Sequence, residues 1–392
     1  VLDRYNGECM RRIVCAKDYF EKLGKKGVVL FGGGSKARQV IEILIDKGIK
    51  IVAVCDNNEK LWGTEIYPGL IVQNFLQVKE EQQGFIVLLT VAINNALSIY
   101  KTLDNTVECY QFCNPFKVEK GLLNDCEIEK NKDQIQEILR CLEDEQSRDI
   151  FIENINYKLT GNMLPLVEMI TGNNSVLTYF DDELFENERS HTYVDIGAYT
   201  GDSITSFLMA TRGNYKKVIA YEGDSGNYKA LERFKTYIRV PELDIRNTIL
   251  WSERAERAIY TFSDNSDINY DSPNLYTEVE NIADNRTLQE VKDAQIMSQK
   301  VRMYTDTLDR QFCGEELPTV MKINAMAADF AIIKGGKRLI ENYKPMLIFE
   351  YGAKKDDLFS MILWLRQINP QYKFYLREKR IYKDIKTILY VK

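Results

Sequence analysis

A glycine-rich turn between a short apolar strand and a helix is the feature of this sequence with the most definite chemistry. The strand is Tyr193-Val194-Asp195-Ile196, and the turn that follows it is Gly197-Ala198-Tyr199-Thr200-Gly201. A second strand, Val218-Ile219-Ala220-Tyr221, ends at Glu222. In such a unit the glycines let the backbone approach a ligand, and the acid at the tip of the second strand accepts hydrogen bonds from both ribose hydroxyls. These residues therefore predict a nucleoside site.

The spacing of the glycines restricts the kind of nucleoside. Gly197 and Gly201 do not follow the full dinucleotide pattern G-x-G-x-x-G, so a mononucleoside such as S-adenosylmethionine fits better than NAD. The residues expected around its methionine part are Asp195, Gly197, Ala198, Tyr199, Thr200 and Gly201. Glu222 is expected at the ribose. Trp251 and Ser252, at the end of the third strand, are expected beside the adenine.

The elements that must position these residues alternate along the C-terminal half. We expect strands at 193–197, 217–222, 244–251, 319–323 and 346–350, helices at 203–212, 226–238, 328–342 and 356–367, and a closing pair of strands near 372–377 and 386–391. This order predicts an α/β fold with a mostly parallel, helix-covered sheet and a late antiparallel strand. The polar stretch 263–285 is expected to be a loop on the substrate side.

Ligands of such sheets bind at the carboxyl ends of the strands, and this rule locates the chemistry. Asn324, at the end of the fourth strand, would face the transferring methyl group or its acceptor. The candidates for a base near the strand ends are Asp329, Glu350 and Tyr351. Lys322 would orient an acid or contact an anionic substrate, although a lysine at such a place is more often solvated. His191 precedes the first strand, so we expect it at the opposite edge of the sheet.

The same motifs resemble the FkbM family of S-adenosylmethionine-dependent methyltransferases. The resemblance rests on residues 193–203, 221–224, 307–309, 320–324 and 387–390, and it runs from about Leu142 to the C-terminus. Tyr179-Phe180-Asp181 is similar to the lead-in of such proteins. The resemblance implies a class I, Rossmann-like methyltransferase domain that O-methylates a sugar or a glycan-related small molecule.

This chain departs from the family pattern at the fourth strand. Where the family has Ile-Lys-Met-Asp-Ile-Glu-Gly-Ala-Glu, the run 321–329 carries Asn324 and Met326 in place of two acids. Tyr351-Gly352-Ala353 likewise lacks the histidine of the family's Tyr-His-Lys. Two interpretations stay open: an enzyme with a different base, which we favour, or a weakened module that binds the cofactor or a nucleotide-sugar. We expect no metal, because Asn324 lacks the charge that attracts a cation.

A second strand, glycine turn, helix and strand occupy the N-terminal third. A strand at 26–31 leads into the turn, a helix follows at 38–47, and a strand at 49–55 precedes an acid. The candidate ligand residues, which match G-x-G-x-x-A followed by a ribose-binding acid, are Gly32, Gly34, Ser35, Ala37 and Asp56. With a further strand at 85–89, this segment resembles the Rossmann-like domain of PglD-type sugar acyltransferases, which implies a nucleotide-sugar ligand. A scaffold without ligand and an NAD-dependent oxidoreductase remain alternatives.

Composition and charge limit the partners. The 52 Lys and Arg against 58 Asp and Glu give a net charge of −6, which offers no general surface for nucleic acid or an anionic membrane. No run of about 18 apolar residues and no secretory segment occur, so we expect a cytoplasmic protein without a membrane span. The eight cysteines have no disulfide-like or zinc-like spacing. Oligomerisation stays open.

Helical spacing between 127 and 162 predicts one or two linking helices. We therefore expect three parts: a Rossmann-like nucleotide- or sugar-binding domain at 1–125, a helical linker and lead-in at 126–185, and the methyltransferase-like domain at 186–392.

Overall fold

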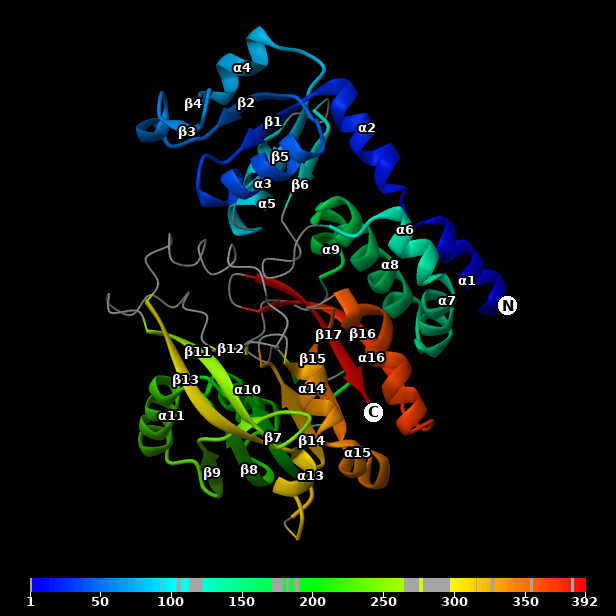
Figure 1. The fold of residues 1–392 in the computed structure, drawn as a ribbon, viewed down its shortest axis with the longest axis vertical. Coiled ribbons are helices and arrows are strands. Elements are labelled where there is room, and N and C mark those ends of the chain that lie inside the picture. The colour runs from blue at the N-terminus through cyan, green and yellow to red at the C-terminus, as the bar shows by residue number, and fades with distance from the viewer. Residues whose placement is uncertain are drawn as a thin grey trace. The chain divides into compact units, whose positions relative to one another are not determined.

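A computed structural model gives the fold of most of the chain (Figure 1). It describes residues 2–91, 93–103, 107–112, 122–170, 179–180, 183–186, 190–263, 275–277, 297–314, 316–325, 328–352, 355–381 and 384–392. They divide into two compact units, 1–172 with 376–387 and 173–375 with 388–392. The boundaries expected at 125 and 185 stay a prediction. Among the described helices, none has both the length and the apolar character needed to cross a membrane.

A six-stranded sheet lies at the centre of the N-terminal part of the first unit. Its strands, in spatial order, are β3 (Glu65–Tyr67), β4 (Leu70–Gln73), β2 (Ile51–Cys55), β1 (Val28–Phe31), β5 (Ile86–Leu89) and β6 (Cys109–Gln111). Neighbouring strands are parallel except β3 and β4. Every residue of β1 and β5 is buried, as in strands covered on both faces. The expected α/β class is confirmed.

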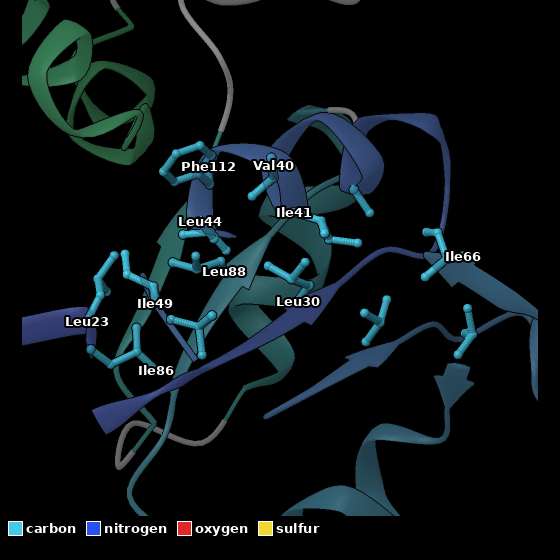
Figure 2. Close-up of a cluster of buried hydrophobic side chains, with 14 residues drawn as sticks. Leu23, Leu30, Val40, Ile41, Leu44, Ile49, Ile66, Ile86, Leu88 and Phe112 are labelled. Atoms are coloured by element: carbon cyan, nitrogen blue, oxygen red, sulfur yellow. The ribbon is translucent and has the colours of Figure 1, made fainter. Parts of the chain in front are cut away.

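Helix α3 (Ser35–Asp46) packs on this sheet because its apolar side chains recur at helical spacing. Val40, Ile41 and Leu44 share one buried cluster with Leu30 and Leu88 of the central strands (Figure 2). Burying each such side chain is worth about 1.5–3 kcal/mol. The helix begins earlier than expected, since the turn that precedes it is confined to its three glycines. The other helices around this sheet are α2 (Ala16–Lys26), α4 (Phe75–Glu81) and α5 (Ile93–Thr102).

Three helices occupy the segment where one or two were expected. They are α6 (Asp125–Lys130), α7 (Lys132–Cys141) and α8 (Glu145–Thr160), and the first unit also contains α1 (Leu2–Arg11) and α9 (Leu164–Glu168). Helix α8 has its own N-cap, since the Asp144 carboxylate accepts the Ser147 backbone N–H at 2.7 Å. It ends at Gly161, whose φ is +76° and where a Cβ would lie 2.6 Å from the Phe112 ring. Local caps therefore divide a segment whose periodicity is almost continuous.

Residues 376–387 belong to the first unit although they lie near the end of the chain. The buried Arg377 guanidinium pairs with Asp144 at 2.8 Å, and Asn154 Nδ2 donates to Thr387 Oγ1 at 2.7 Å. These contacts attach Arg377 of the last strand pair, and Thr387, to helix α8 and its N-cap.

The sheet predicted from the C-terminal half belongs to the second unit except for residues 376–387 of its last two strands, which are counted with the first unit. Its seven strands, in spatial order, are β16 (Phe374–Ile381), β17 (Asp384–Val391), β15 (Met346–Glu350), β14 (Val320–Ile323), β7 (His191–Ile196), β8 (Tyr215–Tyr221) and β9 (Leu243–Arg246). Strands β15, β14, β7, β8 and β9 are parallel, and β17 is antiparallel to β15. The mostly parallel sheet with a late antiparallel strand is confirmed. Its helices include α10 (Asp202–Ala210), α11 (Ser225–Ile238) and α16 (Lys355–Ile368).

The structure differs from the expected elements in three places. The third strand is split into β9 and β10 (Ile249–Leu250), and β10 belongs to a second sheet of order β10-β13-β11-β12. That sheet contains β11 (Glu256–Ser263), β12 (Leu275–Thr277) and β13 (Met297–Asp306), although only a loop at 263–285 was expected between the third and fourth strands. Most of the expected loop 263–285 lies outside the described residues.

The third difference is a helix broken into α14 (Asp329–Lys334) and α15 (Lys337–Tyr343). Gly335 follows α14, and a Cβ there would lie 2.0 Å from the Trp251 carbonyl oxygen. The close approach of another backbone segment therefore requires a glycine at the break.

Candidate functional site

The candidate site lies where three neighbouring parallel strands of the second unit end. Gly197 follows β7, Glu222 follows β8 and Asn324 follows β14. Backbone hydrogen bonds join these ends: the Gly197 N–H donates to the Tyr221 carbonyl at 3.0 Å, and the Asn324 N–H donates to the Ile196 carbonyl at 3.0 Å. The sheet therefore brings the expected glycine turn, the ribose acid and Asn324 to one edge.

Glu222 holds the glycine turn through its side chain. One carboxylate oxygen accepts the Tyr199 N–H at 2.8 Å, and the other accepts the Asp224 N–H at 2.8 Å. Tyr199 has a φ of +50°, a left-handed conformation that such a bond helps to maintain. Burial raises the pKa of Glu222 to about 7, although the two backbone donors partly oppose the rise. The acid expected at the ribose is thus also the residue that shapes the turn.

A buried ion pair lies beneath the turn. The Lys322 ammonium contacts Asp195 Oδ1 at 2.9 Å and donates to the Gly197 carbonyl at 3.0 Å, while Ser203 Oγ donates to Asp195 Oδ2 at 2.6 Å. Both side chains of the pair are almost inaccessible, at 3% and 0% exposure. Burial opposes the charge of Lys322, but Asp195 outweighs it, so the lysine pKa is raised.

Of the alternatives expected for Lys322, the contact with Asp195 agrees with the orientation of an acid, and the burial of the lysine disagrees with a solvated position. The lysine is buried, and Asp195 makes the largest of the contributions that favour its charge against the cost of burial. Asp195, which was expected around the methionine part, supports the turn from beneath.

The glycines of the turn are required by close packing as well as by conformation. Gly197 has a φ of +72°, and a Cβ there would lie 2.1 Å from the Asn324 carbonyl oxygen. Gly201 has a φ of +96°, and its Cβ would meet the Phe234 ring at 2.8 Å. Ala198 is fully buried and Thr200 is exposed. The Ala198 side chain is therefore part of the interior, and a contact of this residue with the cofactor stays a prediction.

Tyr179 is a site residue that the sequence did not identify. Asn324 Nδ2 donates to the Tyr179 hydroxyl oxygen at 3.2 Å, and the Lys322 ammonium lies 5.6 Å from the centroid of the Tyr179 ring. The residue is buried, and it belongs to the lead-in that precedes β7. The sequence showed the lead-in but gave no indication of its partner.

The three candidate bases differ in what they contact. Asp329 accepts the Ala325 N–H at 2.7 Å. The Tyr351 hydroxyl donates to the Leu358 carbonyl, and the residue is buried. Glu350 is half-buried at the end of β15, one residue beyond the register pair Ile323 and Phe349. Glu350 and Asn324 are therefore opposite each other at the ends of the paired strands β15 and β14. Met326 lies outside the described residues.

Trp251 and Ser252 do not follow the third strand of the main sheet, because that strand, β9, already ends at Arg246. The Trp251 N–H donates to the Asp306 carbonyl at 2.8 Å, and Ser252 is exposed. The residue that follows β9 is Asn247, whose Nδ2 donates to the Glu222 carbonyl at 2.8 Å. Asn247 is thus a second candidate site residue that the sequence analysis missed. It could have been found only if the end of the third strand had been predicted at residue 246.

The N-terminal glycine turn is built in the same way. The Gly33 N–H donates to Asp56 Oδ2 at 2.7 Å, and the Asn58 N–H donates to Asp56 Oδ1 at 2.8 Å. Gly32 has a φ of +123° and would clash with Val91 if it carried a Cβ. The remaining expected ligand residues are Gly34, with open space around it, Ser35 at the first position of α3, and the fully buried Ala37. In each unit, an acid after the second strand holds the glycine turn.

His191 lies at the start of β7, the end opposite to the candidate site. Its ring nitrogens lie 3.0 Å from Thr319 Oγ1 and 2.8 Å from the Glu186 carbonyl oxygen. The described part of the chain contains no group of three or more His, Cys, Asp or Glu side chains arranged to hold a metal ion.

Comparison with solved structures gives one extensive similarity. The crystal structure of methyltransferase FkbM from Methylobacillus flagellatus KT aligns with 95% of this chain and 92% of its own, with a TM-score of 0.66 and 17% sequence identity. This chain has the FkbM fold. The resemblance expected from the motifs is therefore confirmed at the level of the fold, and it extends over the N-terminal part as well.

Other comparisons add little to the FkbM similarity. An rRNA methylase from Streptococcus thermophilus aligns with 55% of this chain and 90% of its own, at 12% identity and a TM-score of 0.30. A precorrin-6y C5,15-methyltransferase from Geobacter metallireducens GS-15 aligns with 57% and 99%, at 9% identity and a TM-score of 0.30. No family model matches the chain, and no curated protein matches it. The similarity to PglD-type domains stays a prediction.

Proposed function

We propose that this protein is an S-adenosylmethionine-dependent methyltransferase that O-methylates a sugar or a glycan-related small molecule. The observation that carries the proposal is the carboxylate of Glu222, which lies at the tip of β8 and is hydrogen-bonded to the glycine turn after β7. The FkbM fold over 95% of the chain supports the same activity. The acceptor class rests on the resemblance to the FkbM family alone.

The residues at the strand ends fit the nucleoside part of this cofactor. Each oxygen of Glu222 accepts one backbone N–H, and a carboxylate oxygen has room for a second donor. Both ribose hydroxyls can therefore bind Glu222 without loss of the bonds that hold the turn. Asn247, which is attached to the Glu222 carbonyl, would lie next to the nucleoside.

The cofactor supplies a methyl group that is already activated on a sulfonium, so the protein has mainly to align the acceptor. Asn324 and Tyr179 form a neutral hydrogen-bonded pair at the end of β14 that can orient an acceptor hydroxyl. A poorly acidic hydroxyl also needs a base. We assign this role to Glu350, because it is the carboxylate opposite Asn324 at the ends of the paired strands β14 and β15.

Binding of S-adenosylhomocysteine tests the cofactor assignment. It should raise the melting temperature of the parent protein, because a ligand that binds only the folded state stabilises that state. Its affinity should rise about tenfold between pH 6 and pH 8, since hydroxyl donors prefer ionised Glu222 and the carboxylate has a pKa of about 7. Glu222→Gln should remove both effects.

Tyr237→Ala, at a side chain that is 82% exposed on α11, is the matched control and should behave as the parent. A pH-dependent affinity that persists in Glu222→Gln would exclude Glu222 as the ribose ligand. Absence of any stabilisation in the parent would contradict the proposed cofactor.

A binding module without turnover is the second candidate, and the neutral Asn324 favours it. Methyl transfer from labelled cofactor to a pool of sugars, nucleotide-sugars and glycans separates the two candidates. Transfer that depends on Glu350 supports the enzyme. A parent that binds the cofactor but transfers nothing, together with a gain of activity in Asn324→Asp with Met326→Glu, supports the module.

A further inference from the structure

A hollow on the first unit has the composition of a ligand site, and it does not include the glycine turn. It has a volume of about 450 Å³ and lies where β4 meets α4. We call this hollow the Trp62 pocket. The side chains that line it include Trp62, Ile71, Gln73, Leu76, Gln77 and Glu80. The size is within the range of sites for small molecules. Gly32, Gly34, Ser35, Ala37 and Asp56 do not line it.

Large apolar side chains are exposed in this pocket. Trp62 is 36% exposed, Ile71 is 49% exposed and Leu76 is 68% exposed. Scattered single apolar residues are normal on a protein surface, but several within one hollow indicate a contact surface. The pocket therefore offers an indole and two aliphatic walls to an apolar face of a ligand.

The walls of the pocket are held in place by the surrounding fold. The Trp62 indole N–H donates to the Asp56 carbonyl at 2.8 Å, and the Gly63 N–H donates to the Val72 carbonyl at 2.8 Å. On the other wall, Asn74 caps α4 by accepting the Leu76 N–H at 2.8 Å. A site with fixed walls loses little conformational entropy when a ligand binds.

The charge of the pocket restricts the ligand. Among the described residues that line it, none is a lysine or an arginine, and Glu80 is the only carboxylate. Phosphates and other anions would therefore meet a negative charge without a compensating one. The amides of Gln73 and Gln77 both line the pocket, and each can donate and accept, which suits hydroxyl groups; Gln77 Nε2 uses one donor on Glu81 at 3.0 Å.

We propose that the Trp62 pocket binds an uncharged saccharide ring, with its C–H face on Trp62 and its hydroxyls on the amides and on Glu80. A pyranose combines one apolar face with a rim of hydroxyls, which matches an indole bordered by amides. The site does not depend on the proposed methyl transfer, so the two can fail separately.

Saturation-transfer NMR on the full chain without cofactor tests this proposal. The probes are methyl α-D-glucopyranoside and N-acetylglucosamine, with glucose 6-phosphate, adenosine and choline as competitors of other chemistry. We expect the neutral sugars to bind with a Kd on the order of 1 mM and the phosphate ester to bind more weakly. Trp62→Phe should weaken the sugars by about three- to tenfold.

Leu76→Ala provides a variant that leaves the hydrogen bonds of Trp62 and Asn74 in place, and it should also weaken sugar binding. Tyr237→Ala should leave it unchanged. Sugar binding that is unaffected by Trp62→Phe and Leu76→Ala, or that is absent up to tens of millimolar, would overturn the proposal. So would preferential binding of glucose 6-phosphate, adenosine or choline, or a change of oligomeric state in Leu76→Ala, which would indicate a covered protein interface.

Discussion

The ion pair beneath the glycine turn should be the most sensitive electrostatic contact of the second unit. Lys322→Met keeps much of the side-chain volume but removes the ammonium group that contacts Asp195 and the Gly197 carbonyl. Asp195 is fully buried, and the hydrogen bond from the Ser203 hydroxyl would remain but carries no positive charge. The variant therefore leaves a carboxylate without a counter-ion in the interior.

The expected loss can be estimated from this burial. Removing one partner of a buried ion pair costs about 3–5 kcal/mol, a large part of a typical unfolding free energy of about 5–15 kcal/mol. Asp195→Asn combined with Lys322→Met removes both charges, so it should cost only about 1–2 kcal/mol. The double variant should thus be more stable than Lys322→Met alone. Lys216→Met, at a side chain that is 64% exposed and paired with Glu316, should cost less than about 1 kcal/mol.

Urea unfolding followed by tryptophan fluorescence measures these differences. In a Trp62→Phe background, the two remaining tryptophans, Trp251 and Trp364, both belong to the second unit. The transition then reports that unit, which matters because chains with several units seldom unfold in two states. If Lys322→Met costs no more than Lys216→Met, or if the double variant is less stable than Lys322→Met, the pair does not have the role assigned here.

Three further outcomes follow from the geometry of the site. Gly197→Ala should destabilise the second unit by more than about 3 kcal/mol, because the added Cβ would lie 2.1 Å from the Asn324 carbonyl oxygen. Gly213→Ala, at a residue with a φ of +75° and open space around it, should cost about 1–2 kcal/mol. Equal losses of unfolding free energy in chemical unfolding would refute the steric argument. Between about pH 4.5 and pH 7, the parent should lose roughly 3 kcal/mol of unfolding free energy relative to Glu222→Gln. The reason is that the Glu222 carboxyl ionises at a lower pH in the unfolded chain than in the folded one. Parallel curves of stability against pH for the two proteins would contradict the pKa of about 7. Asn324→Asp replaces the amide that donates to Tyr179, so it should change kcat or acceptor choice far more than the Kd of S-adenosylhomocysteine. A change confined to the Kd would show that Asn324 contacts the cofactor.

Much of the fold could be predicted from local patterns. The strand expected at 193–197 is β7 at 191–196, and the helix expected at 226–238 is α11 at 225–238. Apolar runs bounded by glycine or polar residues indicated these elements. Strand β13 was missed, although Val301, Met303 and Thr305 alternate with polar residues, because charged side chains interrupt any apolar run.

The site was predictable only in part, because local patterns do not show which distant residues the fold brings together. By itself the sequence determined the glycine turn and the acid after the next strand, because strand, turn and helix signals act over a few neighbouring residues. Only the tertiary structure decided the partners of Lys322 and Asn324, since Asp195 lies 127 residues from Lys322 and Tyr179 lies 145 residues from Asn324. Whether a lysine is solvated or buried depends on the charge that the fold places next to it, and no local pattern contains that information.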